Sequence, residues 1–503
     1  MTPAEVQGLK QAARTALESG QNELAERAAR RLVFEAPSAE AYDILSCALR
    51  NQERFSQALS ASDAALRLDP NDVPARHNRA LVLTRLGRSQ EALKVFDALI
   101  SAGVRAPPLW LGRGSALMEL SRVADAEAAF ADGVRQWPND GDLLQAFASV
   151  RWMRRAKPDF AGAFEAAVAR NPEIIPLRLG CADLLRRAGF ADKCESMLRK
   201  GLARAPDTPV LLSSLATVLD ESGRCEEALA LYERAVAIAP GIAVQRAGLA
   251  NVYLRLGRAA EALGLILPLR AAQPLNQEWI TYETTALRQL GDARYHDLCD
   301  YDFMVRAYDI ATPPGYTSVE AFNEEFYAAL MRLHVLDAHP LDQSLHNGSQ
   351  TTRNLTHVAD PPVQAYFKAI DAPIQAYMEL MREHARTHPN HPWSSRVTGK
   401  YSIAGSWSVR LKADGFHVNH FHPAGWISSA YYVSLPKAVT EAPGQQGWIK
   451  FGEPRWPTPG CTIEKVVQPQ AGRLVLFPSY MWHGTIPFSE GERMTAPIDV
   501  VPA

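Results

Sequence analysis

The chain has 503 residues, more than one hydrophobic core usually serves, so at least two domains are expected. Its 53 Lys and Arg residues nearly balance 55 Asp and Glu residues, which gives no electrostatic reason to expect nucleic acid or an anionic membrane as a partner. The N-terminus has no basic segment followed by an apolar run, and no apolar stretch of about 18 residues occurs, so we expect a cytoplasmic protein.

The N-terminal part is periodic. Its prolines, turn residues and small residues each recur at multiples of 34 positions. The prolines are Pro70, Pro138, Pro172, Pro206, Pro240 and Pro274; the turn residues are Gly87, Ser121, Arg155, Gly189, Gly223, Gly257 and Gly291; the small residues are Ala80, Gly114, Ala148, Ala182, Ala216 and Ala250. Proline stops a helix and glycine turns the chain, so this pattern predicts stacked pairs of helices.

This pattern resembles the tetratricopeptide repeat (TPR) from about residue 7 to residue 292, or about eight repeats. We therefore predict an all-α TPR superhelix as the first domain, residues 1–292. The resemblance implies a concave groove that holds a protein or peptide segment. An array that only spaces or dimerises the second domain is the alternative.

The period stops after Asp292, and we predict a second domain over residues 293–503. Helices are expected near 319–336 and 361–384. Short alternating runs between turn residues then predict eight strands, near 400–411, 415–422, 426–435, 447–452, 462–468, 473–477, 482–487 and 492–500. Eight strands without intervening helices favour a double-stranded β-helix, or jelly roll, with flanking helices.

Three histidines of this domain suggest a metal site. His420 and His422 are two residues apart on the second expected strand, so their side chains share one face. His483 falls on the seventh strand, which can lie beside the second in a jelly roll. Three imidazoles on neighbouring strands can bind a metal ion on one side and leave its other positions open.

Together with Arg493 and Thr495 on the last strand, these residues resemble the iron(II)/2-oxoglutarate-dependent oxygenases. Several phrases are similar to a bacterial and phage group of such enzymes: Gly415-Phe416-His417, Trp426 to Tyr432, Gly472 to Ser479, and Trp482 to Thr485. The resemblance implies Fe(II), 2-oxoglutarate and O2, with His420, His422 and His483 as metal ligands. Arg493 would hold the far carboxylate of 2-oxoglutarate, helped by Thr495 and Tyr432. No catalytic residue is expected beyond this metal site.

One position departs from the family, which usually has a carboxylate where this chain has His422. An alternative register, His417-Val418-Asn419, would place an amide there, but amides are weak iron ligands. Three functions follow. The first is a dioxygenase that hydroxylates a protein or peptide recruited by the repeats. The second is a three-histidine, thiol-type dioxygenase that does not use 2-oxoglutarate, and the third is a TPR scaffold with a degenerate oxygenase domain.

Overall fold

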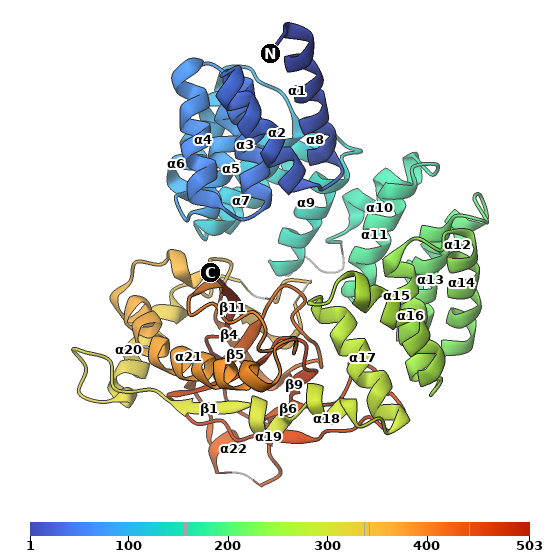
Figure 1. The fold of residues 1–503 in the computed structure, drawn as a ribbon, viewed down its shortest axis with the longest axis vertical. Coiled ribbons are helices and arrows are strands. Elements are labelled where there is room, and N and C mark those ends of the chain that lie inside the picture. The colour runs from blue at the N-terminus through green and yellow to red at the C-terminus, as the bar shows by residue number, and fades with distance from the viewer. Residues whose placement is uncertain (155–158, 337, 342, 442) are drawn as a thin grey trace. The chain divides into compact units, whose positions relative to one another are not determined.

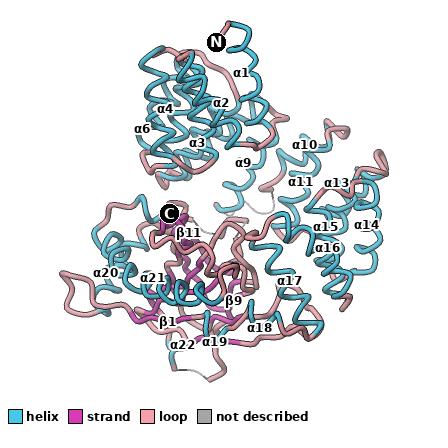
Figure 2. The backbone as a smooth tube through the Cα atoms, in the orientation of Figure 1, coloured by secondary structure: helices cyan, strands magenta, loops and turns pink. Residues whose placement is uncertain are grey.

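The computed structural model describes residues 1–154, 159–336, 338–341, 343–441 and 443–503. The described chain forms two compact units, residues 1–150 and 151–503. Figure 1 traces the helices and strands along the chain, and Figure 2 shows helices in cyan and strands in magenta. Among the described residues, no helix is both long and apolar enough to cross a bilayer.

The helical part is a series of paired helices. Those that begin in the first unit are α1 (Pro3–Glu18), α2 (Asn22–Glu35), α3 (Ala39–Asn51), α4 (Phe55–Leu68), α5 (Val73–Arg85), α6 (Ser89–Ser101), α7 (Pro107–Glu119), α8 (Val123–Gln136) and α9 (Gly141–Met153). Those of the second unit are α10 (Gly162–Arg170), α11 (Ile175–Arg187), α12 (Ala191–Leu202), α13 (Pro209–Glu221), α14 (Cys225–Ile238), α15 (Ala243–Arg255), α16 (Ala259–Ala272) and α17 (Gln277–Leu290).

The 34-residue step reappears in the helix starts. Helices α3, α5, α7, α9, α11, α13, α15 and α17 begin at residues 39, 73, 107, 141, 175, 209, 243 and 277. The turn after such a helix is left-handed, with φ of +81° at Gly223 and +63° at Gly291, and Ser121 adopts the same conformation at +58°. Glycine suits this position because it has no Cβ. Arg155, the third member of that series, lies outside the described residues.

The remaining elements form the C-terminal part. Its helices are α18 (Arg294–Leu298), α19 (Tyr301–Met304), α20 (Val319–Met331), η1 (Leu355–His357), α21 (Pro361–Thr387) and α22 (Lys437–Thr440). Its strands are β1 (Arg306–Asp309), β2 (Leu345–Gln350), β3 (Tyr401–Ser406), β4 (Val409–His417), β5 (Ile427–Ser434), β6 (Ile449–Phe451), β7 (Lys465–Val467), β8 (Arg473–Pro478), β9 (His483–Thr485), β10 (Arg493–Thr495) and β11 (Ile498–Pro502).

These strands form two antiparallel sheets. The larger sheet has the order β1-β8-β5-β10-β4-β2, with β11 pairing both β3 and β5, and the smaller sheet has the order β7-β6-β9. Helices α20 and α21 lie beside the larger sheet (Figure 1), and their side chains Phe326 and Tyr366 pack on Tyr431 of β5. The predicted class, a helical repeat array followed by an antiparallel β domain with flanking helices, is confirmed. The finer assignment to a jelly roll, and the boundary at residue 292, stay predictions.

The prediction of eight strands was wrong in detail. The run expected over 400–411 breaks at Trp407, whose N–H donates to Pro497 O, and becomes β3 and β4. The run over 492–500 likewise divides into β10 and β11. Two further strands, β1 and β2, come from segments without alternating hydrophobicity. Strand β4 ends at His417, so His420 and His422 lie on the irregular segment after it rather than on a strand.

Helix α17 connects the two parts. It ends the repeat array, yet its Ile280 and Leu287 belong to the same buried cluster as Ile427 and Leu474 of the β domain. The Thr281 hydroxyl donates to Tyr480 O at 2.6 Å, and Trp482 Nε1 donates to the Thr285 hydroxyl at 3.0 Å. The last repeat helix is therefore part of the framework on which His483 is mounted.

Candidate metal centre

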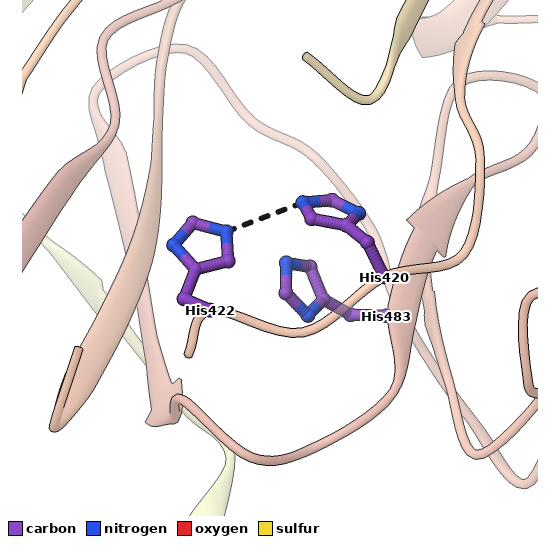
Figure 3. A group of neighbouring side chains, drawn as sticks. All are labelled: His420, His422 and His483. Carbon is purple, nitrogen blue, oxygen red and sulfur yellow. Dashed lines mark hydrogen bonds between the residues drawn. The ribbon is translucent and has the colours of Figure 1, made fainter. Parts of the chain in front are cut away.

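Two backbone segments bring the three histidines together. His420 and His483 exchange both of their backbone hydrogen bonds, at 2.8 and 2.9 Å, as an antiparallel bridge. The His422 N–H donates to Ser479 O at 2.9 Å. As Figure 3 shows, the three rings face one another. One nitrogen of each ring lies within 4.8 Å of the others, and no further His, Cys, Asp or Glu among the described residues joins this group.

The hydrogen bonds of the rings define which nitrogens are free. The Nδ1 atoms of His420 and His483 lie 2.8 and 2.9 Å from Val418 O and Met481 O, and His422 Nδ1 lies 2.6 Å from Asp499 Oδ1. Carbonyl and carboxylate oxygens only accept, so each Nδ1 carries a proton and each Nε2 is the nitrogen left for another partner. The Nε2 atoms of His420 and His422 are 3.2 Å apart, which is close enough to share one proton or one cation.

Burial keeps two of these rings neutral. It lowers the pKa of His420 to about 3, with the neighbouring His422 as the next cause, and it lowers the pKa of His483 well below its ordinary value. Neutral imidazole is the form that binds a metal ion. These two rings therefore offer neutral donors to a divalent transition metal at neutral pH.

Arg493 lines the cavity that the three histidines also line, and it is buried without an acidic partner among the described residues. It is 2% exposed, its Nη1 donates to Gly447 O at 2.7 Å, and its Nε has no hydrogen-bond partner among the described residues. Its guanidinium lies 5.4 Å from the centre of the Tyr432 ring, whose buried hydroxyl is also without a partner there. Burial lowers the pKa of Arg493 and raises that of Tyr432 to about 12. A buried cation and a buried donor with unmet hydrogen bonds fit an anion such as a carboxylate.

Thr495 lies near the same groups. It pairs with Tyr432 of β5 and Val409 of β4, and it is 4% exposed. Thr495 and Arg493 both line the cavity onto which the three histidines open. All six residues expected from the sequence therefore come together in one region.

The alternative register is not favoured by the geometry. The Asn419 amide donates to Glu453 Oε2 at 2.9 Å and to Pro454 O at 3.0 Å, so its side chain is engaged elsewhere. His417 Nδ1 lies 2.9 Å from the Ser344 hydroxyl, which is also 3.2 Å from His420 Nε2. His417 is thus a neighbour of the group and not a member of it.

The cavity next to the histidines has a volume of about 1100 Å³. One wall carries the histidines, with Phe421 and Trp482 beside them. The other wall is the face of the repeat helices α11, α13, α15 and α17, and includes Arg187, Asp220 and Tyr282. The ring centres of Tyr282 and Phe421 are 6.3 Å apart, so helix α17 of the repeat array lies close to the three histidines.

Sequence reasoning missed Asp499. It lines the same cavity as Arg493, Thr495 and Pro497, at alternate positions along the chain. This period of two was the signal that could have found it, since residues two apart on a strand share one face.

Comparisons with known proteins agree with the two parts of the chain. Residues 405–499 match the family described as "Putative 2OG-Fe(II) oxygenase". Two tetratricopeptide repeat families match residues 45–109, 77–141, 111–173 and 179–241, and residues 221–281. The chain combines tetratricopeptide repeats with a 2OG-Fe(II) oxygenase-type domain.

Solved structures are similar only in part. A tetratricopeptide repeat protein from Parabacteroides merdae ATCC 43184 has a TM-score of 0.34 and 19% identity, over 49% of this chain and 98% of its own. The APC/C hetero-tetramer Cut9-Hcn1 has a TM-score of 0.30 and 16% identity, over 52% of this chain and 53% of its own. Among curated proteins, none is similar enough to this chain to count as a relative.

Proposed function

We propose that the protein is an Fe(II)- and 2-oxoglutarate-dependent dioxygenase that hydroxylates a protein or peptide substrate presented by the repeat array. The observation that carries this proposal is the convergence of three imidazole nitrogens, within 4.8 Å of one another, on a cavity that is also lined by buried Arg493, whose Nε has no partner among the described residues. The first group suits a metal ion and the second suits a dicarboxylate. The match of residues 405–499 to the oxygenase family supports the same reading.

Each residue has a defined task in this proposal. His420, His422 and His483 would hold iron, and three facial ligands leave positions for 2-oxoglutarate and O2. When bound, these groups supply the oxidising chemistry, in which 2-oxoglutarate becomes succinate and CO2 while a substrate C–H bond is hydroxylated.

Arg493 would bind the far carboxylate of 2-oxoglutarate. Its Nε is free to donate, and its burial strengthens a charge-assisted bond because little water competes there. Tyr432, whose ring centre lies 5.4 Å from the guanidinium, and Thr495, which pairs with Tyr432 across the sheet, would share the task. Gly447 O holds the other side of the guanidinium, so the fork is fixed before the ligand arrives.

A substrate polypeptide would occupy the remaining space. The cavity of about 1100 Å³ is larger than 2-oxoglutarate needs, and its second wall consists of repeat helices. Phe421 lies between His420 and His422, and Trp482 precedes His483, with the two rings 5.2 Å apart. This aromatic wall would exclude water from the oxidised position.

Anaerobic metal titration and a turnover assay test the proposal. Purified protein with Fe(II), 2-oxoglutarate, ascorbate and O2 should release succinate, and His483→Ala should abolish both iron binding and turnover. Oxygen consumption that is indifferent to 2-oxoglutarate would instead indicate the three-histidine, thiol-type dioxygenase. Absence of iron binding together with absence of turnover would leave only the TPR scaffold with a degenerate oxygenase domain.

A further inference from the structure

The three histidines are held by unlike partners. His420 and His483 donate from Nδ1 to backbone carbonyls, whereas His422 donates to the Asp499 carboxylate at 2.6 Å. The ring that stands where the oxygenases usually have a carboxylate is thus the ring that is bonded to one.

Asp499 is held firmly in this position. The Ser428 hydroxyl donates to the same Oδ1 at 2.8 Å, and the backbones of Asp499 and Ser428 are paired between β11 and β5. The Ser479 hydroxyl lies 2.8 Å from that of Ser428, and the backbone of Ser479 also binds the His422 N–H. One network therefore fixes both the carboxylate and the backbone of the histidine.

The contact changes the charge that a metal ion meets. Three neutral imidazoles contribute no negative charge against a divalent cation. A carboxylate that accepts the Nδ1 proton makes Nε2 a stronger donor and brings an anion within one ring of the metal position. It also restricts rotation of the ring, as does the Trp407 ring stacked 6.2 Å from it.

We propose that Asp499, acting through His422, supplies the anionic charge that the three-histidine set lacks and orients that ring for a divalent transition metal. Asp499 is a positioning residue, and this inference rests on the proposed metal site. It explains how a histidine can replace the usual carboxylate while the centre as a whole keeps one negative charge.

The test compares Asp499→Asn with wild type in the full chain. An amide can still accept the Nδ1 proton but carries no charge, so Fe(II) affinity under anaerobic conditions should fall about 10- to 100-fold. The Fe(III)/Fe(II) midpoint potential should rise, because loss of an anion disfavours the higher charge. Asp309→Asn removes an equal charge from a surface pair with Arg473 and should change neither quantity.

A second variant covers the case in which Asp499→Asn does not fold. Ser428→Ala keeps the charge and removes one bond that orients it, and should weaken Fe(II) binding by a smaller factor. Unchanged affinity and potential in Asp499→Asn would overturn the role of Asp499 and leave the oxygenase proposal intact. Weakened metal binding in a protein that does not turn over 2-oxoglutarate would support Asp499 and reject the oxygenase. Wild type that binds no divalent metal would overturn both.

Discussion

Arg493 carries a full charge in a nearly dry position, and the part of the chain that the structure describes offers it no acidic partner. Isolated charges are costly to bury, so a protein normally pairs or exposes them. Here the guanidinium has one backbone acceptor, Gly447 O, and leaves its Nε unused. Retaining such a residue is understandable when a ligand supplies the missing anion. The same reasoning applies to the unpartnered hydroxyl of Tyr432.

Replacement of the Arg493 side chain should weaken the binding of 2-oxoglutarate selectively. We expect Arg493→Ala to raise the Kd for 2-oxoglutarate by roughly 10- to 100-fold, since hydrogen bonds to charged groups contribute about 1.5–3 kcal/mol. Calorimetric titration of the metal-loaded protein would measure it. Arg473→Ala, at a surface pair with Asp309, is the matched control and should leave the Kd unchanged. An equal Kd in Arg493→Ala and wild type would rule out the carboxylate-binding role.

Two histidines away from the metal group set a pH dependence. Burial lowers the pKa of His334 and of His391 to about 4. Below the unfolded value of 6.5 the unfolded chain takes up protons that these folded rings do not bind. Stability that is present above pH 6.5 is therefore lost as the pH falls toward 4.

We expect the free energy of unfolding to fall by about 2 kcal/mol for each ring when the pH is lowered from 7 to 5. Urea unfolding of the metal-free protein at both pH values would show the decrease. His391→Asn should make it smaller, while replacement of the exposed His296 should not. A pH dependence that is equal in both variants would contradict the assignment to His391.

At the scale of elements, helix α17 has two roles. It completes the repeat stack, and its Thr281 and Thr285 hydroxyls bind the segment just before His483, at Tyr480 O and Trp482 Nε1. Its Tyr282 contacts Phe421, between the other two histidines. The geometry of the metal group thus depends on a helix that belongs to the repeats.

The Thr281 hydroxyl offers a direct test of this dependence. Thr281→Val removes a buried bond to Tyr480 O and should destabilise the protein by about 1–2 kcal/mol. It should also weaken Fe(II) binding, because the segment before His483 is then less well held. Thr284→Val is the control, since that buried hydroxyl donates to Thr281 O rather than to the segment before His483. Equal losses of metal affinity in the two variants would argue against positioning by α17.

At the scale of the whole molecule, the cavity next to the three histidines is lined both by the repeat helices and by the β domain. Val244, at the start of α15, lines this cavity and is 71% exposed, so a larger side chain fits without disturbing the core. We expect Val244→Trp to raise the KM for a polypeptide substrate about tenfold or more while substrate-independent conversion of 2-oxoglutarate stays unchanged. Leu267→Trp, on the outer helix α16, is the control. Mass-spectrometric assay of the hydroxylated polypeptide distinguishes the two, and an unaffected KM would exclude entry along the repeat face.

Patterns between neighbours in the chain determined much of this protein. Prolines and left-handed turn residues at a step of 34 predicted the repeat helices, because a helix starts and stops according to the residues at its own ends. The spacing of His420, His422, His483 and Arg493 likewise predicted a common site. In the structure, all four residues line one cavity.

Contacts between distant segments were decided only by the tertiary structure. The sequence could not show that β4 would end before His420, because the backbone partner that orders this segment is His483, 63 positions later. Nor could it show that Thr281 would bind Tyr480, 199 positions away, or that Asp499 would meet His422. Such pairs depend on how whole elements pack, and their hydrogen bonds form only when burial brings both partners into one place.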